Sequence, residues 1–161
     1  MAAHFAERAR ACGADVSLAF ALPERLPLPE TDFCMAMANL LENAVEACER
    51  AERGEGGAGE RGSTAQDGAR PLFVDAEARI EGNAVLVSVR NSCTPSDARA
   101  LAAAAPDGVL SSDARSAKRE GDGIGLASVA TLAKRYRGEV QVEIDEYAAT
   151  IRVLLRTGGA R

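Results

Sequence analysis

The chain contains no tryptophan, 4% aromatic residues and a single histidine among its 161 residues, and its cysteines occur one at a time. Without a closely spaced cysteine pair or a second histidine, neither a disulfide framework nor a structural zinc site is indicated. We expect the four cysteines to be reduced thiols packed as small apolar side chains. They are Cys12, Cys34, Cys48 and Cys93.

Long apolar runs and an excess of basic charge are also missing. No run approaches the ~20 residues that a membrane-spanning helix needs, so we expect no direct membrane insertion of this chain. The first ten residues lack the apolar core and cleavage pattern of a secretory signal, which favours a cytoplasmic domain. The net charge of −5 disfavours nucleic acid as a partner, because nucleic acid binds a cationic face. A small anionic ligand needs only local donors and a metal ion.

What the chain does contain is the composition of one globular domain, with 47% hydrophobic and 27% charged residues. Strands in hairpins that interleave with helices predict an α+β fold. We expect a two-layer sandwich with a mixed, mostly antiparallel sheet covered on one face by helices. The periodicity predicts helices at 1–13, 31–53, 96–105 and 124–136, and strands at 16–22, 72–80, 84–89, 139–144 and 148–155.

The composition also predicts how the domain is bounded. Residues 14–156 form the expected domain, and 1–13 read as the end of an upstream linker helix. Residues 54–70 are rich in glycine and poor in large apolar side chains, so we expect a mobile surface loop inserted in the domain. Residues 157–161 are expected to be a disordered tail. Thr31 or Asp32 is the expected N-cap of the longest helix.

A polar row lies along the predicted helix 31–53. Asn39, Asn43 and Glu46 fall at i, i+4 and i+7, which places them on one helical face beside an apolar one. Asparagine is a poor helix former, so two at this spacing indicate a role beyond surface filling. Amide and carboxylate oxygens aligned in this way suit a hydrated Mg²⁺. A merely solvated helix face is the alternative.

A glycine-rich turn opens the predicted helix 124–136. Glycines let a backbone approach a ligand closely, and the first turn of a helix offers unpaired N–H donors, so the turn suits phosphate groups. It lacks the third glycine of a dinucleotide fingerprint and the lysine of a P-loop. Lys118, just upstream, is a candidate phosphate contact, and an unliganded turn is the alternative. The turn reads Gly121-Asp122-Gly123-Ile124-Gly125-Leu126.

Asn91 follows the predicted strand 84–89 in a polar turn. Its amide can accept a hydrogen bond from an exocyclic amine and donate another to a ring nitrogen, as asparagine does with adenine. An ordinary turn residue is the alternative at a strand end. Asn91 is therefore a candidate contact for a nucleotide base.

In this order and spacing the three clusters resemble the catalytic and ATP-binding domain of sensor histidine kinases. That domain belongs to the GHKL superfamily of gyrase, heat-shock chaperone, histidine kinase and MutL, and the greatest resemblance is to bacterial peptide-pheromone and quorum-sensing receptors. The segment 39–47 matches the asparagine box of the family. The segment 121–126, with Ser128 and Val129 after it, matches the second glycine box. The resemblance covers about residues 14–156 and implies the Bergerat fold.

The resemblance also implies roles for these residues. Asn43 would ligate the Mg²⁺ that bridges the triphosphate of ATP, and Asn39 would assist on the phosphate side. Asn91 stands where the family more often has an aspartate that pairs with the adenine amine. Hydrolytic members have a water-activating glutamate in place of Asn39, so phosphoryl transfer is implied rather than hydrolysis. The residues expected to contact nucleotide are Asn39, Asn43, Glu46, Asn91, Lys118, Gly121, Gly123, Ile124, Gly125 and Leu126.

The implied activity is that of a protein histidine kinase, which transfers the γ-phosphoryl group of ATP to a histidine on a separate dimerisation domain absent from this chain. His4 is unsuited as the acceptor, because Phe5 follows it where an acidic residue is usual. The full-length protein would be anchored in the bacterial inner membrane and serve a response regulator indirectly. Two alternatives remain open: a protein serine kinase of the anti-sigma-factor kind, and a non-catalytic interaction module with the same fold.

Overall fold

The computed structural model describes residues 2–55, 71–111, 124–145 and 147–158. In the described chain the elements follow in the order α1, β1, α2, β2, β3, α3, α4, β4, β5. The helices are α1 (Ala2–Ala11), α2 (Glu30–Glu52), α3 (Pro95–Ala104) and α4 (Ile124–Arg135). The strands are β1 (Asp15–Ala21), β2 (Phe73–Glu81), β3 (Ala84–Ser92), β4 (Glu139–Ile144) and β5 (Ala148–Arg156).

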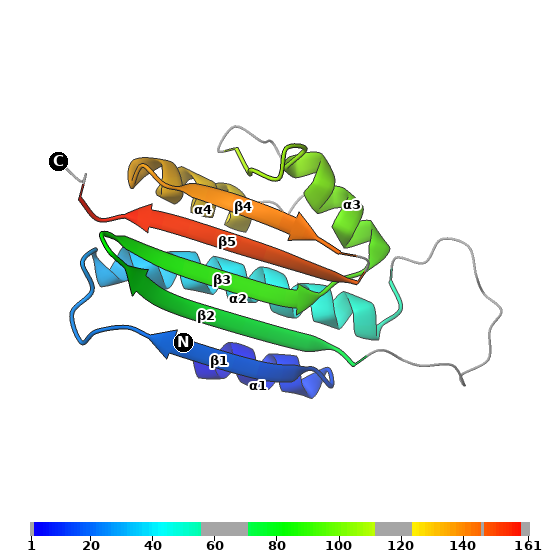
Figure 1. Cartoon of the computed structure of the whole chain (residues 1–161). Coiled ribbons are helices and arrows are strands. Elements are labelled where there is room, and N and C mark those ends of the chain that lie inside the picture. The colour runs from blue at the N-terminus through cyan, green and yellow to red at the C-terminus, as the bar shows by residue number, and fades with distance from the viewer. Residues whose placement is uncertain (1, 56–70, 112–123, 146, 159–161) are drawn as a thin grey trace.

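The five strands form one sheet in the order β1-β2-β3-β5-β4. β1 runs parallel to β2, and the other three neighbouring pairs are antiparallel. Helices α1, α2 and α4 lie against one face of the sheet, and α3 lies beside β4 (Figure 1). The predicted α+β sandwich with a mixed, mostly antiparallel sheet is confirmed.

The core lies between the sheet and the helices because both carry apolar side chains at the right period. Alternate residues of the central strands point toward the helices, and their neighbours face the opposite side. In β3, for example, Val85, Val87 and Val89 are at most 1% exposed. The long helix contributes an apolar stripe that is equally buried. Its members are Met37, Leu40, Leu41, Ala44, Val45 and Cys48.

The start of α2 differs from the prediction. The helix begins at Glu30, and Pro29 is the capping residue, without a side-chain hydrogen bond to the helix. Neither Thr31 nor Asp32 is the N-cap. The physical reason is a competing contact: the Asp32 carboxylate accepts hydrogen bonds from Tyr136 and Arg135 of the distant α4 region.

Two segment boundaries also differ from the sequence prediction, and a third predicted segment lies largely outside the described residues. β3 continues through Ser92, so Asn91 lies within the strand, paired with Val74 and Ala149, and not in a turn after it. Thr157, predicted to lie in a disordered tail, donates its N–H and its hydroxyl to the Asn83 carbonyl at 2.7 and 2.8 Å. Of the predicted mobile loop 54–70, residues 56–70 lie outside the described residues, as do residues 159–161 of the tail.

The two rims of the sheet differ. Along β4, the backbone of residues 108–110 adds two hydrogen bonds: Leu110 N–H to the Val140 carbonyl (2.9 Å) and Gly108 C=O to the Val142 N–H (2.8 Å). β1 forms the other rim, and among the described residues no strand pairs with its outer side. None of the described helices is long and apolar enough to cross a membrane.

The cysteine prediction holds in part. Cys12, Cys48 and Cys93 are free thiols buried in the core, as expected of small apolar side chains. Cys34 is also a free thiol but is exposed on α2. It is not a core residue, because its position in the helix falls outside the apolar stripe.

Candidate functional site

The asparagine row, defined as Asn39, Asn43 and Glu46, runs along one side of α2, where all three side chains are half-buried. Arg50 continues the row by one more turn. The apolar stripe of the same helix faces the sheet, so the row lies at the edge of the core rather than on a fully solvated face. Polar groups in this position are accessible to a ligand and are held by a rigid helix.

The beginning of α4 lies directly against this row. A Cβ atom placed on Gly125 would stand 3.3 Å from the Asn39 Oδ1 atom and 3.6 Å from its Cβ atom. Gly125 is the second residue of α4, so the N-terminus of a 12-residue helix faces the amide of Asn39. The predicted juxtaposition of the two segments is therefore present, and the missing side chain at 125 is what lets α4 approach Asn39 this closely.

Asn91 lies on the helix-covered face of β3, in phase with Val87 and Val89, and is 1% exposed. Its Nδ2 donates to the Ser92 carbonyl at 2.9 Å, which fixes the orientation of the amide. Its Oδ1 is then buried without a hydrogen-bond partner, the one such side-chain atom among the described residues. A buried acceptor without a donor is destabilising, so this atom indicates a ligand that supplies an N–H or O–H group.

Asn91 also lies close to α2. The Ser92 carbonyl that accepts from Asn91 is 3.9 Å from the Cys48 thiol, which is a weak sulfur contact across the core. Burial raises the pKa of Cys48 to about 12, so this thiol stays protonated and neutral at physiological pH. The interior near Asn91 is therefore uncharged on this side, which suits the flat, neutral face of a base.

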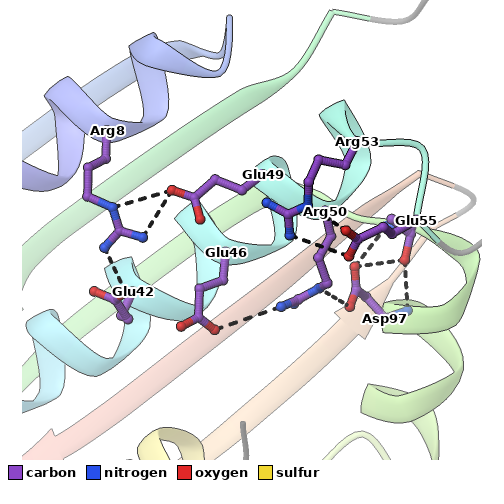
Figure 2. Close-up of polar contacts among 9 residues, drawn as sticks. Arg8, Glu42, Glu46, Glu49, Arg50, Arg53, Glu55 and Asp97 are labelled. Atoms are coloured by element: carbon purple, nitrogen blue, oxygen red, sulfur yellow. Dashed lines mark hydrogen bonds and ion pairs between the residues drawn. The ribbon is translucent and has the colours of Figure 1, made fainter. Parts of the chain in front are cut away.

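A group of partly buried ion pairs connects the end of α2 to the start of α3 (Figure 2). Arg50 Nε donates to Asp97 Oδ1 at 3.0 Å, and Arg50 Nη1 is 3.8 Å from Glu46 Oε2. The other oxygen of Asp97 accepts from the backbone N–H (3.2 Å) and the hydroxyl (2.8 Å) of Thr94, the N-cap of α3. The Arg50 and Asp97 side chains are 19% and 10% exposed.

A second arginine binds α2 from the side of α1. Arg8 of α1 donates to Glu42 at 2.7 Å and to Glu49 at 3.0 Å, and Figure 2 shows both contacts where α2 faces α1, whereas Arg50 points toward α3. The two carboxylates are seven residues apart, so one guanidinium spans two turns of α2. This contact fixes α1 on α2, and its carboxylates flank the asparagine row on the side that faces α1.

A third polar contact joins the N-terminal end of α2 to the C-terminal end of α4. Tyr136 OH donates to Asp32 Oδ2 at 2.5 Å, and Arg135 pairs with the same oxygen. The Tyr136 hydroxyl and then Arg135 lower the pKa of Asp32, while burial and then the bond to Asp32 raise the pKa of Tyr136. Since α4 begins close to Asn39 and ends here, the two helices lie against each other along the length of α4, and the polar contact at Asp32 holds one end.

Some predicted site residues cannot be placed. Lys118, Gly121 and Gly123 lie outside the described residues. Ile124 and Leu126 lie in the first turn of α4. The side chain of Leu126 packs against the hydrophobic core, so it contributes to the packing of the helix. Among the described residues, no three histidine, cysteine, aspartate or glutamate side chains are grouped so that they could hold a metal ion.

Two hollows elsewhere on the described surface are less suitable as the site. One, of about 630 Å³, lies on the sheet face opposite the helices and is lined by charged residues such as Arg79 and Arg152. Both arginines already pair with glutamates there. The other, of about 400 Å³, is mostly apolar and lies around Phe73, Cys93 and Tyr147. Neither includes the asparagine row or Asn91.

The site therefore combines three features along α2. The first is the amide oxygen of Asn91, which has no hydrogen-bond donor. The second is the pair of amide side chains of Asn39 and Asn43. The third is the N-terminus of α4, where Gly125 lies next to Asn39. A base with an exocyclic amine fits the first, and phosphate oxygens or a hydrated divalent cation fit the others. The sequence predicted these residues but did not indicate Arg50 and Asp97, which have no local signature because they are 47 residues apart.

One family model matches the chain. It describes the histidine kinase-, DNA gyrase B- and HSP90-like ATPases, and it matches residues 29–158. The matched range contains α2, Asn91 and α4, and it leaves out α1 and β1. No curated protein matches the chain significantly.

Solved structures of low sequence identity share the fold. The histidine kinase AdeS of Acinetobacter baumannii has a TM-score of 0.59 and 10% identity, covering 98% of this chain and 61% of its own. A histidine kinase from Burkholderia phymatum STM815 has a TM-score of 0.59 and 17% identity, covering 98% and 66%. A nucleotide-free catalytic domain of histidine kinase ThkA has a TM-score of 0.61 and 19% identity, covering 96% and 86%. The chain thus spans less than two thirds of the first two proteins.

Proposed function

Because the chain belongs to the family of histidine kinase-, DNA gyrase B- and HSP90-like ATPases, we propose that it is the ATP-binding and catalytic domain of a sensor histidine kinase. In this proposal the domain binds Mg-ATP and transfers the γ-phosphoryl group to a histidine on a separate dimerisation domain, and ADP is released. The phosphate accepted by that histidine would pass to a response regulator.

The observation that carries the proposal is the buried, unpartnered Oδ1 atom of Asn91. An adenine amine offers the N–H donor that this oxygen lacks, whereas guanine has a carbonyl oxygen at the equivalent ring position. The Nδ2–Ser92 hydrogen bond uses the donor of the amide and leaves Oδ1 as its free acceptor. Asparagine can therefore serve here in place of the aspartate that the family more often has, because a neutral amide oxygen still accepts from an amine.

The remaining residues fit a triphosphate. Asn43 would supply an amide oxygen to Mg²⁺, and Asn39 would donate to the phosphate side from the neighbouring turn of the asparagine row. Gly125 brings the positive end of α4 close to Asn39, where phosphate oxygens would be bound by both. A bound Mg²⁺ neutralises charge on the triphosphate. Lys118, Gly121 and Gly123 are proposed to contact the phosphates from the segment before α4.

These residues would act by positioning and charge complementarity rather than by acid–base chemistry. Asn39 cannot activate water as a carboxylate does, so the geometry supports transfer to a bound acceptor over hydrolysis. Glu46 lies 3.8 Å from Arg50, so its carboxylate already faces a cationic partner. The proposal therefore assigns binding and orientation to the chain and leaves the attacking nitrogen to the acceptor domain.

Calorimetric titration of the 161-residue chain with Mg-ATP tests the proposal. We expect wild-type protein to bind, Asn43→Ala to bind at least about tenfold more weakly because a ligand of the cation is lost, and GTP to bind more weakly than ATP. Asn83→Ala, which changes an asparagine of the β2–β3 turn, is the matched control and should bind as wild type does. Undetectable binding by wild type, or equal binding by Asn43→Ala, would refute the proposal.

The acceptor separates the remaining alternatives. A histidine kinase should phosphorylate a histidine-bearing helical hairpin supplied in trans, and the product should be acid-labile. Acid-stable phosphoserine on a partner would support the anti-sigma-factor type, and binding without transfer would support a non-catalytic module. The chain is further proposed to be a cytoplasmic part of a receptor anchored in the bacterial inner membrane, of the quorum-sensing subgroup.

A further inference from the structure

The strongest feature outside the proposed nucleotide contacts is the ion pair between Arg50 and Asp97. Arg50 lies one turn beyond Glu46 on the side of α2 that carries the asparagine row. Asp97 lies in the first turn of α3. The Nε–Oδ1 distance is 3.0 Å, and the two side chains are only 19% and 10% exposed. An ion pair this shielded is weakly screened by salt and holds a defined geometry better than a surface pair.

Asp97 makes more contacts than an ordinary ion-pair partner. Its Oδ2 accepts from the N–H and the hydroxyl of Thr94, and its own N–H donates to the Thr94 hydroxyl at 3.1 Å. This reciprocal arrangement is a capping box, so the carboxylate that fixes the first turn of α3 also bonds to α2. The start of α3 is thereby held to the end of α2.

The position of this contact matters because of what lies on either side of it. Thr94 follows Asn91 by three residues, so the segment between them joins the proposed base contact to the capping box. On α2, Glu46 lies one turn before Arg50 and Asn43 nearly two turns before it. The Arg50–Asp97 pair thus sets the spacing between the part of the site proposed for the base and the part proposed for the cation.

We infer that Arg50 and Asp97 are positioning residues that hold α3 and the Asn91 end of β3 at the correct distance from the asparagine row. The inference rests on the proposed function. Neither residue is assigned a contact with nucleotide. Their effect is exerted through the backbone at Thr94 and through α2.

The test is a double-mutant cycle read out by nucleotide affinity. We expect Arg50→Met and Asp97→Asn each to weaken Mg-ATP binding about fivefold. The double variant should bind about as weakly as the weaker of the two, because the second change removes a contact already lost. Arg50→Lys keeps the charge but cannot reproduce the Nε contact, so we expect its Mg-ATP affinity to lie between those of Arg50→Met and wild type.

Arg8→Met is the matched control. Arg8 also joins two helices through two carboxylates of α2, but it joins α2 to α1 and not to α3. We expect this variant to lower the melting temperature while Mg-ATP affinity changes less than twofold. Equal loss of affinity in the Arg8 and Arg50 variants, additive effects in the cycle, or wild-type affinity in Arg50→Met would each overturn the inference. Absence of binding by the wild-type chain would instead refute the proposed function, and the inference with it.

Discussion

Gly125 and Gly138 lie near the two ends of α4, and at each of them the missing side chain allows a different neighbour to come close. A Cβ at Gly125 would meet the side-chain oxygen of Asn39 at 3.3 Å, whereas a Cβ at Gly138 would lie 1.6 Å from the backbone carbonyl oxygen of Leu154. A side chain can rotate away, but the backbone of a central strand cannot. Replacing Gly125 should therefore affect the candidate site, and replacing Gly138 should affect the stability of the fold.

The two glycines predict opposite results on alanine substitution. Gly125→Ala gains helix propensity, up to about 1 kcal/mol, so the free energy of unfolding should be unchanged or slightly higher. The same variant should bind Mg-ATP several-fold more weakly, because Asn39 must move. Gly138→Ala should lose at least about 2 kcal/mol of stability through the overlap with β5. Urea unfolding and calorimetric titration check both, and a destabilised Gly125→Ala protein with normal affinity would contradict this reading.

The sequence was most informative about residues whose role depends on a local pattern. Asn39 and Asn43 were found from their helical spacing, and Gly125 from its place at a helix start. Residues whose partners are distant in sequence were missed, because neither Arg50 nor Asp97 shows a pattern of its own. Asn91 was predicted to contact the base, and that role stays a prediction, but its burial within β3 could not be anticipated, since an asparagine at the end of a strand is typical of a turn.

At the scale of elements, α2 and α4 are joined where the Tyr136 hydroxyl and Arg135 meet the Asp32 carboxylate. A hydrogen bond to a charged group in a partly buried position contributes about 2 kcal/mol. Because both partners titrate, the contribution has a defined pH range. Asp32 has a lowered pKa and Tyr136 a raised one, so the pair is favourable between the two.

Tyr136→Phe should therefore destabilise the protein by about 2 kcal/mol near neutral pH. The Asp32 contribution is present above its ordinary pKa of about 4 and is lost as pH falls through the lowered value. The Tyr136 contribution is present below about 10 and is lost as pH rises through the raised value. The difference in unfolding free energy between wild type and Tyr136→Phe, measured in urea from pH 3 to 11, should become smaller at both the acid and the alkaline limit. In an Asp32→Asn background the acid limb should disappear, and a difference independent of pH would contradict the assignment.

The bounds of the elements followed from the sequence more closely than the contacts between them. Hydrophobic periodicity and the turn at 81–83, where Gly82 has φ of +58°, located most helices and strands to within one or two residues. The start of α2 was placed wrongly, because an aspartate near a helix start can bond either to its own backbone or to another helix. Only the tertiary structure decides between these partners.

At the scale of the whole molecule, the core isolates three thiols from solvent. Burial raises the pKa of Cys48 to about 12 and that of Cys93 to about 11, and it also raises the pKa of Cys12. Cys34 is exposed. Since the thiolate is the reactive form, thiol reactivity reports how much of the core is open.

A thiol reagent such as dithionitrobenzoate should react rapidly with one cysteine per native chain and with all four after denaturation. Cys34→Ser should abolish the rapid phase. The three slow thiols should react together, at the rate at which the core opens. Two or more rapid thiols in the native wild-type protein would show that the core is more accessible than the structure indicates.

The outer side of β1 has a consequence for self-association. Hydrogen-bonding groups along an unpaired rim invite another strand, and the described part of this chain leaves one rim open while residues 108–110 occupy the other. If two copies paired through their β1 strands, each would then have no unpaired edge strand left among the described residues. Growth by sheet extension would then stop at two copies, so crowding of this domain favours closed pairs over filaments.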